Sequence, residues 1–269
     1  MRAITPNLKQ AFRFPSGIRV VHLDEVASTN EEALRLAAQG ELGGLWVVAR
    51  SQAKGRGRGG RAWSSPPGNL YASHLLRLTC PLMTAQQLTL LAPVALFDAV
   101  AALLGLPLRS SDQLRLKWPN DLLVGGAKIS GILLESAIAP SGGLALVMGF
   151  GLNLDSHPVG LDQPATHLAA QGCDSTPEQA LATLAESMAC WLTQWNGGRG
   201  FAAIRAAWLA RAGAIGEVLR VRTSPDPAVP RVEGTFAGLD DAGALLLNHV
   251  DGSQSRHIQG DVALGAVDR

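Results

Sequence analysis

The sequence has few cysteines and almost no net charge, and each shortage excludes a class of protein. Its three cysteines, Cys80, Cys173 and Cys190, are odd in number, far apart and without a CxxC pair, so we expect neither a disulfide framework nor a zinc site. The formal net charge is +1, which gives the molecule as a whole no strong field toward nucleic acid or membrane. The composition favours buried free thiols, and any strongly charged segment must be a local feature.

The sequence also lacks long uninterrupted apolar runs. The longest run, 88–106, is interrupted by Pro93 and Asp98, and the opening stretch MRAITPNLKQAFRFPSG has no apolar signal core. We therefore expect a soluble cytoplasmic protein that has no contact with a membrane. There is no internal repeat, and the one low-complexity tract is a Gly/Arg-rich stretch at 51–63.

The chain of 269 residues, of which 47% are hydrophobic, is long enough to bury a full core. Helical patterns occupy 28–40, 84–105, 176–195 and 201–213. We expect Thr29, Thr84 and Thr176 at the N-caps, because Glu32 and Gln87 follow the first two at capping-box spacing and a proline follows the third. The apolar width of the second pattern predicts a central, mostly buried helix.

Short segments rich in Val, Leu and Ile lie between these helices, separated by Gly, Pro and Ser. The predicted strands are LWVVAR, NLYASHLLRL, QLRLKWPNDLLV, AKISGILLES and LALVMGFGLNL. After about Ala212 the helical patterns stop, and the strand patterns GEVLRVRT, RVEGTFAGL, GALLLNHV and QSRHIQGDVAL follow. We expect an α+β protein with a larger domain at 1–212 and a small β-barrel domain at 213–269.

The segment LKWPNDLLVGGAKISG predicts a β-hairpin that carries charge. If its GG pair is a two-residue turn, Leu123 faces Lys128 and Asp121 faces Ser130. Strand alternation then places Lys117, Asp121, Leu123 and Lys128 on one face, unless the WPN proline introduces a bulge. Taken alone, an ordinary solvated Lys/Asp pair is the favoured interpretation, and a binding site is the alternative.

Two further stretches allow both a structural and a functional interpretation. Gly149 and Gly151 interrupt an apolar strand, which suits either close approach of a ligand or a tight sheet crossing. Ser28, Thr29 and Asn30 gather three hydrogen-bonding side chains before a helix, although one cap needs only one of them. For the tripeptide alone, capping is favoured over ligand binding.

The stretch SQAKGRGRGGRAW concentrates Lys54, Arg56, Arg58 and Arg61 among glycines. RNA contact is disfavoured because the repeat is single and the protein nearly neutral, and the stretch lacks the GK[ST] of a Walker A loop. A plain linker does not require arginine. Arginine forks and glycine amides suit phosphate or carboxylate oxygens, and Trp63 can stack on a base. We expect a loop that is mobile until it closes on an anionic ligand.

Taken together, the motifs resemble those of the biotin protein ligases, also called holocarboxylase synthetases. QAKGRGRGGRAW, KWPNDLL, KISGILLE and GFGLNL follow STN in that family's order. The joint match is specific, although each motif alone is weak or moderate. The resemblance implies a catalytic domain like the class II aminoacyl-tRNA synthetases, with a mixed sheet flanked by helices, and an SH3-like β-barrel behind it.

The resemblance also implies roles for individual residues. The implied biotin-binding residues are Ser28, Thr29, Asn30, Gln52, Gly55, Arg56, Gly57, Arg58, Lys128 and Gly131. The implied ATP-binding residues are Arg61, Trp63, Lys117, Asn120, Asp121 and Asn153. Among these, Lys128, Arg58 and Lys117 are the expected catalytic residues, and no metal ligand is indicated.

The implied reaction uses ATP and Mg²⁺ to convert biotin to biotinoyl-5'-AMP. The biotinoyl group then passes to a lysine of the biotin carboxyl carrier protein of acetyl-CoA carboxylase or a related carboxylase, with release of AMP. Only about twenty residues precede the first predicted strand, too few for a helix-turn-helix domain, so we expect no DNA binding. A homodimer stays open. The rival hypotheses are a lipoate ligase or octanoyl transferase and an RNA-binding module.

Overall fold

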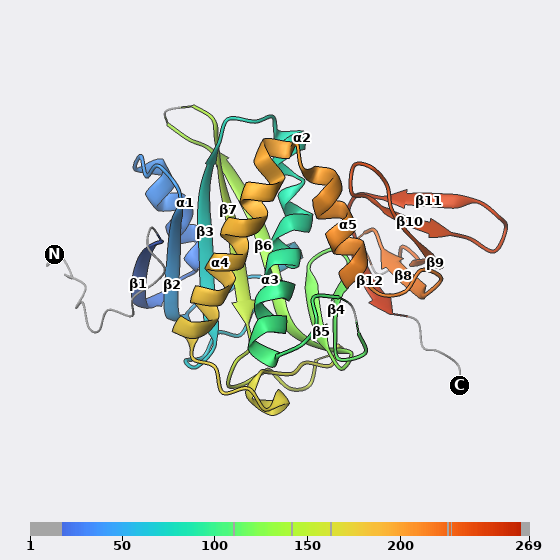
Figure 1. The fold of residues 1–269 in the computed structure, drawn as a ribbon, viewed down its shortest axis with the longest axis horizontal. Helices are drawn as coiled ribbons and strands as arrows, with labels where there is room; N and C mark the ends of the chain where they lie inside the picture. The colour runs from blue at the N-terminus through green and yellow to red at the C-terminus, as the bar shows by residue number, and fades with distance from the viewer. Residues whose placement is uncertain are drawn as a thin grey trace, which may run out of the picture.

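The structure is a computed structural model, and it describes residues 18–264 except 110, 141, 162, 225 and 227. The described chain forms a seven-stranded sheet with helices on both faces, followed by a separate five-stranded sheet near the C-terminus (Figure 1). This arrangement confirms the predicted α+β class and the mixed sheet flanked by helices.

The large sheet has the strand order β1-β2-β3-β7-β6-β5-β4. Its strands are β1 (Arg19–Val26), β2 (Leu45–Gln52), β3 (Leu70–Leu78), β4 (Leu114–Lys117), β5 (Asp121–Val124), β6 (Ala127–Ile138) and β7 (Leu144–Leu152). The first two strands are parallel, because a helix connects them, and every other neighbouring pair is antiparallel. The sheet is therefore mixed, with its one parallel pair at an edge.

The helices divide between the two faces of this sheet. They are α1 (Thr29–Ala38), α2 (Leu82–Ala85), α3 (Leu88–Leu104), α4 (Pro177–Trp195) and α5 (Phe201–Arg211), with 3-10 turns η1 (Arg58–Gly60), η2 (Ala169–Gln171) and η3 (Asn196–Gly198). Helices α3, α4 and α5 pack together over one face, in front of the sheet in Figure 1. Helix α1 packs on the opposite face, against β2, β3 and β7.

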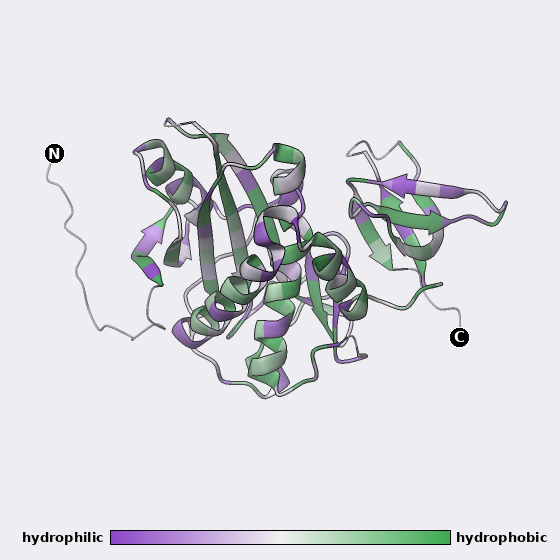
Figure 2. Ribbon diagram, turned by 45° about the horizontal axis from the view of Figure 1, so that its top comes forward, coloured by the Kyte–Doolittle hydropathy of each residue, from purple (hydrophilic) through white to green (hydrophobic). Residues whose placement is uncertain are grey.

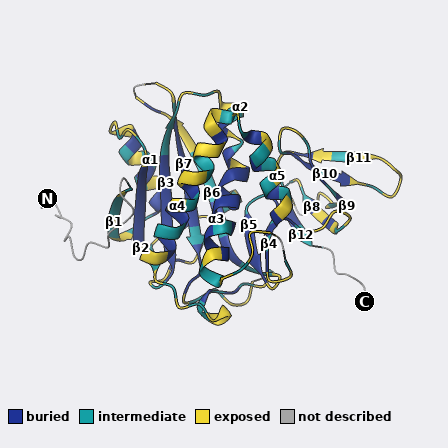
Figure 3. Cartoon of the chain, in the orientation of Figure 1, coloured by how far each residue is buried: buried dark blue, intermediate teal, exposed yellow. Residues whose placement is uncertain are grey.

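Helix α3 is the centre of the main core. It is apolar over most of its surface, as its mainly green colour in Figure 2 shows, and most of it is buried (Figure 3). Within the described residues, the helical stretch Leu82–Leu104 is long and apolar enough to cross a membrane, but 67% of its most apolar window is buried inside the protein. The prediction of a central buried helix is confirmed.

The two faces of strand β7 contact different parts of the protein. Met148 and Phe150 point into the core beneath α3, while Val147 belongs to the smaller cluster beneath α1. Gly149 and Gly151 lie on the same side as Val147, since side chains alternate along a strand. The face toward α1 is therefore apolar at one end of β7 and without side chains at the other.

The small C-terminal sheet is antiparallel, in the order β11-β10-β9-β8-β12. Its strands are β8 (Val218–Arg222), β9 (Val232–Leu239), β10 (Leu245–Asn248), β11 (Gln254–His257) and β12 (Asp261–Leu264). The predicted domain boundary at 212/213 falls between α5 and β8. The boundary and the SH3-like character of the sheet stay predictions.

Several local predictions are wrong. The predicted strand at 113–124 is divided by a turn into β4 and β5, and the last predicted strand is likewise divided into β11 and β12. The helix expected after Thr84 splits into α2 and α3, whose N-cap Gln87 makes no side-chain cap bond. The prediction that Thr176 caps α4 is confirmed, and the structure adds a reciprocal capping box between Thr176 and Gln179.

The three thiols are free, as predicted, but they are not buried. Cys190 is exposed on α4, and Cys80 and Cys173 are half-buried near the helix ends. These cysteines therefore lie at the periphery of the core rather than inside it.

Candidate active site

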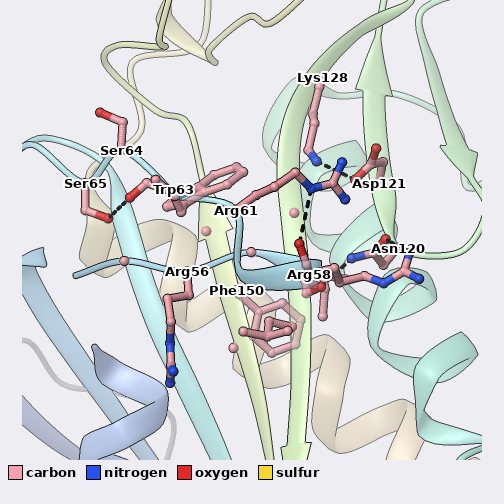
Figure 4. A pocket seen from close by; sticks show the side chains of 18 of the residues that line it. Arg56, Arg58, Arg61, Trp63, Ser64, Ser65, Asn120, Asp121, Lys128 and Phe150 are labelled. Atoms are coloured by element: carbon pink, nitrogen blue, oxygen red, sulfur yellow. Dashed lines mark hydrogen bonds and ion pairs between the residues drawn. The ribbon is translucent and has the colours of Figure 1, made fainter. Parts of the chain in front are cut away.

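A cavity of about 740 Å³ opens on the face of the large sheet that carries α1. Its walls are formed by the start of α1, the β4–β5 turn, β6, β7, the start of β12 and the loop 53–65. This loop contains most of the Gly/Arg-rich stretch and is called the Gly/Arg-rich loop below. Its volume lies in the range typical of small-molecule sites. Figure 4 shows part of its lining, with the loop crossing in front of the sheet.

One end of the cavity is built from uncharged polar side chains. The Thr29 backbone N–H and hydroxyl both donate to Gln52 Oε1, at 2.9 and 3.2 Å. Gln52 Nε2 in turn donates to Ser65 Oγ at 2.9 Å. Ser28 and Thr29 are buried, and Ser28 occupies the N-cap position of α1 without a side-chain cap bond. The favoured capping interpretation of this tripeptide is therefore wrong, because tertiary partners engage the Thr29 side chain instead.

Asn30 extends this network behind the wall of the cavity. Its Nδ2 donates to the Leu133 carbonyl at 3.2 Å and to Glu135 Oε2 at 2.8 Å. Ser73 on β3 donates from Oγ to Asn30 Oδ1 at 2.6 Å and lies 2.7 Å from the Thr29 hydroxyl. A Cβ on Gly149 would come within 2.2 Å of Asn30 Oδ1, so only glycine fits there. Gly149 thus makes room for the asparagine.

The other end of the cavity carries two lysines around one carboxylate. Lys117 Nζ lies 2.9 Å from one Asp121 oxygen, and Lys128 Nζ lies 2.6 Å from the other. Lys117 also donates to Gln163 Oε1 at 3.0 Å. Burial raises the pKa of Asp121, but the charges of Lys128 and Lys117 outweigh burial and hold that pKa below its ordinary value. The cluster therefore keeps two ammonium groups and one carboxylate, a net positive site.

The hairpin that builds this cluster follows the predicted pairing only in part. Leu123 pairs with Lys128 as predicted, but Asp121 lies opposite Gly131, not Ser130. A bulge between Leu122 and Leu123 causes the difference, because the β6 strand carries one extra residue there. The predicted shared face survives, since both lysines still contact Asp121.

The Gly/Arg-rich loop is folded back on itself. The Gly57 N–H donates to the Arg61 carbonyl at 2.7 Å, and the Trp63 N–H donates to the Gly55 carbonyl at 2.9 Å. Gly59 and Gly60 turn the chain with φ of 63° and 74°, a region that favours glycine. A Cβ on Gly55 would lie 2.5 Å from the Trp63 carbonyl oxygen, so this glycine permits the closure.

The arginines of the loop point to different parts of the molecule (Figure 4). Arg58 donates to Asn120 Oδ1 at 3.3 Å and to the Gly260 carbonyl at 3.1 Å, and Arg61 lies 2.9 Å from Asp261 Oδ1. Burial lowers the pKa of Arg58, and Asp261 opposes that shift. The loop thus connects the β4–β5 turn with the C-terminal sheet.

Arg56 points away from this pair toward α1 (Figure 4). Its guanidinium lies 3.6 Å from Glu31 and 3.5 Å from Glu135. Because Glu135 also accepts from Asn30, it links the loop with the uncharged end of the cavity.

Trp63 lies flat on the sheet between the two ends. A Cβ on Gly151 would come within 2.5 Å of its indole ring, and one on Gly131 within 3.1 Å. Lys128 Nζ lies 5.7 Å from the ring centroid, within reach of a cation–π interaction. The indole Nε1 is buried and has no hydrogen-bond partner among the residues that the structure describes. The two glycines therefore form a platform for the indole.

The structure places every residue of the predicted site in the lining of this cavity. These are Ser28, Thr29, Asn30, Gln52, Gly55, Arg56, Gly57, Arg58, Arg61, Trp63, Lys117, Asn120, Asp121, Lys128, Gly131 and Asn153. Sequence reasoning missed Gln163 and Asp261 in the lining and Ser73 and Glu135 behind it. Glu135 closes the KISGILLE motif, so its position was a signal, whereas Asp261 lies in no motif.

Comparisons with known proteins agree with this geometry. The model of the biotin/lipoate A/B protein ligase family matches residues 25–153. A biotin–[acetyl-CoA-carboxylase] ligase of Paracoccus denitrificans is 42% identical over 233 residues, covering 84% of this chain and 93% of that protein. The bifunctional ligase/repressor BirA of Bacillus subtilis is 31% identical over 258 residues, covering 93% of this chain and 75% of that protein.

Solved structures point the same way. The biotin protein ligase of Aquifex aeolicus in complex with biotin and ATP has a TM-score of 0.74 and 26% identity, covering 92% of this chain and 98% of that one. The biotin protein ligase of Leishmania major in complex with biotinyl-5-AMP has a TM-score of 0.60 and 26% identity, covering 88% and 98%. This chain therefore belongs to the biotin protein ligases of the biotin/lipoate A/B protein ligase family.

Proposed function

We propose that this chain activates biotin with ATP and attaches it to a protein lysine. In the first step the biotin carboxylate attacks the α-phosphorus of ATP, forming biotinoyl-5'-AMP as the bond to pyrophosphate breaks. In the second step the ε-amine of a carrier lysine attacks the acyl carbon, an amide forms, the amine loses a proton and AMP leaves. The observation that supports this proposal most directly is a single cavity with an uncharged hydrogen-bonding end and a cationic end.

The uncharged end suits the ring of biotin, which is polar but carries no charge. Thr29 and Gln52 are held by their mutual hydrogen bonds, so their remaining hydrogen-bonding capacity is fixed in direction before a ligand arrives. Ser28 adds a buried hydroxyl beside them. A site built to hydrogen-bond a polar ring rejects analogues that lack those groups, because its buried polar atoms are then left unpaired.

The cationic end suits the reacting groups. An anionic carboxylate must approach an anionic phosphate, and their repulsion opposes the reaction. Lys117, Lys128 and Arg58 offset that repulsion and the charge that develops on the phosphorus centre, from positions that hydrogen bonds already fix. Holding both reactants in one cavity adds the advantage of a unimolecular step. The mechanism needs no covalent nucleophile from the protein.

Trp63, Asn120, Asn153 and Arg61 are proposed to hold the nucleotide. Asn120 and Asn153 are each oriented by a bond from Nδ2 to a backbone carbonyl, of Ile132 and Thr166 respectively. Trp63 offers its indole as a surface for adenine.

Mg²⁺ is proposed to enter with the phosphates of ATP. Among the described residues no group of three or more His, Cys, Asp or Glu side chains could hold a metal. The cavity carboxylates Asp121 and Asp261 are each paired with cations. The residues fit an ion held mainly by nucleotide oxygens and water, as Mg²⁺ commonly is, and when bound it supplies further positive charge at the phosphates.

The remaining assignments are proposals of the same kind. The acceptor is proposed to be the biotin carboxyl carrier protein of acetyl-CoA carboxylase or a related carboxylase, and the reaction is proposed to occur in the cytoplasm. The catalytic domain is proposed to resemble class II aminoacyl-tRNA synthetases and the C-terminal sheet to be an SH3-like barrel. Absence of DNA binding stays a prediction, and a homodimer stays open.

The test is incubation of the purified protein with ATP, Mg²⁺, biotin and a biotin-carrier domain, followed by intact mass measurement of the carrier. The expected result is addition of one biotinoyl group, dependent on ATP and on the carrier lysine. Transfer of lipoate in place of biotin would assign the lipoate branch of the family. No transfer of either, together with tight salt-dependent binding of single-stranded RNA, would support the RNA-binding alternative.

A further inference from the structure

The cavity has a second carboxylate that no motif contains, Asp261 at the start of β12 in the C-terminal sheet. It lies 2.9 Å from Arg61 and 3.5 Å from Arg58, so one anion bridges two arginines of the loop. Its side chain is 45% exposed, and it faces the same cavity as the lysines around Asp121. Both arginines are therefore partly neutralised by a group outside the large sheet.

Other contacts also hold the loop in place. Arg58 also donates to Asn120 Oδ1 and to the Gly260 carbonyl, two acceptors that carry no charge. Arg61 also donates from Nε to the Arg58 carbonyl at 3.1 Å. The Gly57 to Arg61 and Trp63 to Gly55 backbone bonds close the loop without Asp261. What Asp261 specifically adds is therefore a negative charge beside Arg58 and Arg61.

We propose that Asp261 competes with the phosphate groups of the nucleotide for Arg58 and Arg61. The inference rests on the proposed function for its biological meaning, because that function brings ATP in and sends pyrophosphate out. In the empty enzyme the carboxylate takes the place that phosphate oxygens take in the loaded one. When pyrophosphate has formed, Asp261 offers the arginines an alternative partner, which favours release of the product.

The chemistry of the groups supports a competition. Arginine forks bind carboxylates and phosphates with the same geometry, so one guanidinium cannot fully serve both. An exposed pair such as Arg61 and Asp261 is weak in water, which makes it exchangeable. The Asp261 carboxylate also repels phosphate groups that approach Arg58 and Arg61, because it lies beside both arginines. Removing one such unit charge in a largely aqueous setting should tighten anion binding about three- to tenfold, and less at high salt.

The test compares Asp261→Asn with Asp241→Asn. Both substitutions remove one negative charge and keep the side-chain size, but Asp241 is fully exposed in the same C-terminal region and does not line the cavity. Calorimetry with inorganic pyrophosphate, at low and at moderate salt, gives the dissociation constant for each variant. We expect Asp261→Asn to bind about three- to tenfold more tightly than the native protein, with the gain shrinking in salt, and Asp241→Asn to bind as the native protein does. Weaker or unchanged binding by Asp261→Asn overturns the competition.

A second measurement separates this inference from the proposed function. In the Asp261→Asn variant the carboxylate no longer holds Arg61, so the segment around Arg61 should bind in the active site of trypsin more readily. Cleavage after Arg61 in the ligand-free protein should therefore be faster in Asp261→Asn than in Asp241→Asn. Equal rates contradict the contact itself. Neither readout needs catalysis: a native protein that releases no pyrophosphate from ATP and biotin refutes the proposed function, while the binding and cleavage results still decide the role of Asp261.

Discussion

Asp121 and Asp261 each bridge two cations of the same cavity, but they are built differently. Asp121 and Lys117 have side chains only 11% and 9% exposed, and both lie in the short β4–β5 hairpin. Asp261 is 45% exposed and reaches its arginines across about two hundred residues of sequence, from another sheet. The first cluster is held on three consecutive paired strands, and the second by side-chain contacts between two parts of the fold.

The difference separates a permanent charge arrangement from an exchangeable one. A buried carboxylate between two ammonium groups cannot be removed without leaving charge in a poorly solvated place. An exposed carboxylate beside two arginines can be replaced by water or by another anion at small cost. We therefore expect the Asp121 carboxylate and its lysines to determine rate and folding, and the Asp261 carboxylate to tune affinity.

The largest expected effect is on the rate of the first reaction step, when a lysine of the Asp121 cluster is replaced. Lys128→Ala should slow biotin-dependent release of pyrophosphate by about 10³-fold, because it removes a fixed cation from the reacting groups. Arg61→Ala should slow it by less than about tenfold, since Arg61 is exposed. Arg109→Ala, at an exposed arginine outside the cavity, serves as the control. Equal losses for Lys128→Ala and Arg61→Ala would end the distinction between the clusters.

The next effect is on stability. Asp121→Asn should lower the free energy of unfolding by about 3 kcal/mol, because Lys117 and Lys128 then repel each other with no anion between them. Asp261→Asn should change it by less than about 0.5 kcal/mol. Urea denaturation measures both. The cause is confirmed if Lys128→Met restores part of the stability in the Asp121→Asn background, and contradicted if it does not.

The loss of folding stability at acid pH should depend mainly on His74, which belongs to neither cluster. Burial lowers the pKa of His74 to about 4, and its ring is stacked on Trp46. The unfolded chain binds a proton near pH 6.5 and the folded one only near 4, so stability falls as the pH is lowered through that window, by about 2 kcal/mol between pH 7 and 5. Asp121, with its lowered pKa, keeps its contribution there and loses it only at lower pH. Denaturation of native protein and His74→Phe across this range measures the slope, and an unchanged slope in the variant would contradict the assignment.

The smallest expected effect belongs to Trp63, which lies between the uncharged and the cationic ends of the cavity. Trp63→Ala should weaken ATP binding by about 1 kcal/mol, at the lower end for a base on an aromatic ring, because part of the indole already packs on the sheet. Biotin has no aromatic ring, so its binding should change less. Calorimetry with each ligand, beside Trp63→Phe as control, gives the answer. Equal losses for the two ligands would mean that the indole serves only to pack the loop.

The same contrast explains how far the sequence could predict the site. The Asp121 cluster lies on three consecutive strands, β4, β5 and β6, that short turns join. The predicted Gly-Gly turn correctly brings Lys128 near Asp121, whereas Lys117 meets Asp121 as its partner across the β4–β5 turn, which alternation along one strand did not predict. Even there the bulge was invisible, and Asp121 was paired with Ser130 in place of Gly131. Sequence pattern predicts these contacts because the residues that make them are close in sequence.

Long-range contacts lie beyond such reasoning. Thr29 looked like a helix cap, but Gln52 and Ser73, distant in sequence, engage its side chain. Nothing near Asp261 marks it as a partner of Arg61, because that contact depends on how two sheets are placed against each other. The residues that the family resemblance implied for the site all line the cavity, yet the resemblance identified no partner outside its own motifs.

Strand β7 bears two unequal mutational constraints on alternate residues. Met148 and Phe150 face a large core, where another apolar side chain of similar volume can repack. Gly149 and Gly151 face Asn30 and Trp63 so closely that even alanine is excluded. Among homologues, substitutions should therefore follow a period of two along this strand. Apolar residues should replace one another on the core side, whereas the two glycines on the cavity side should stay unchanged.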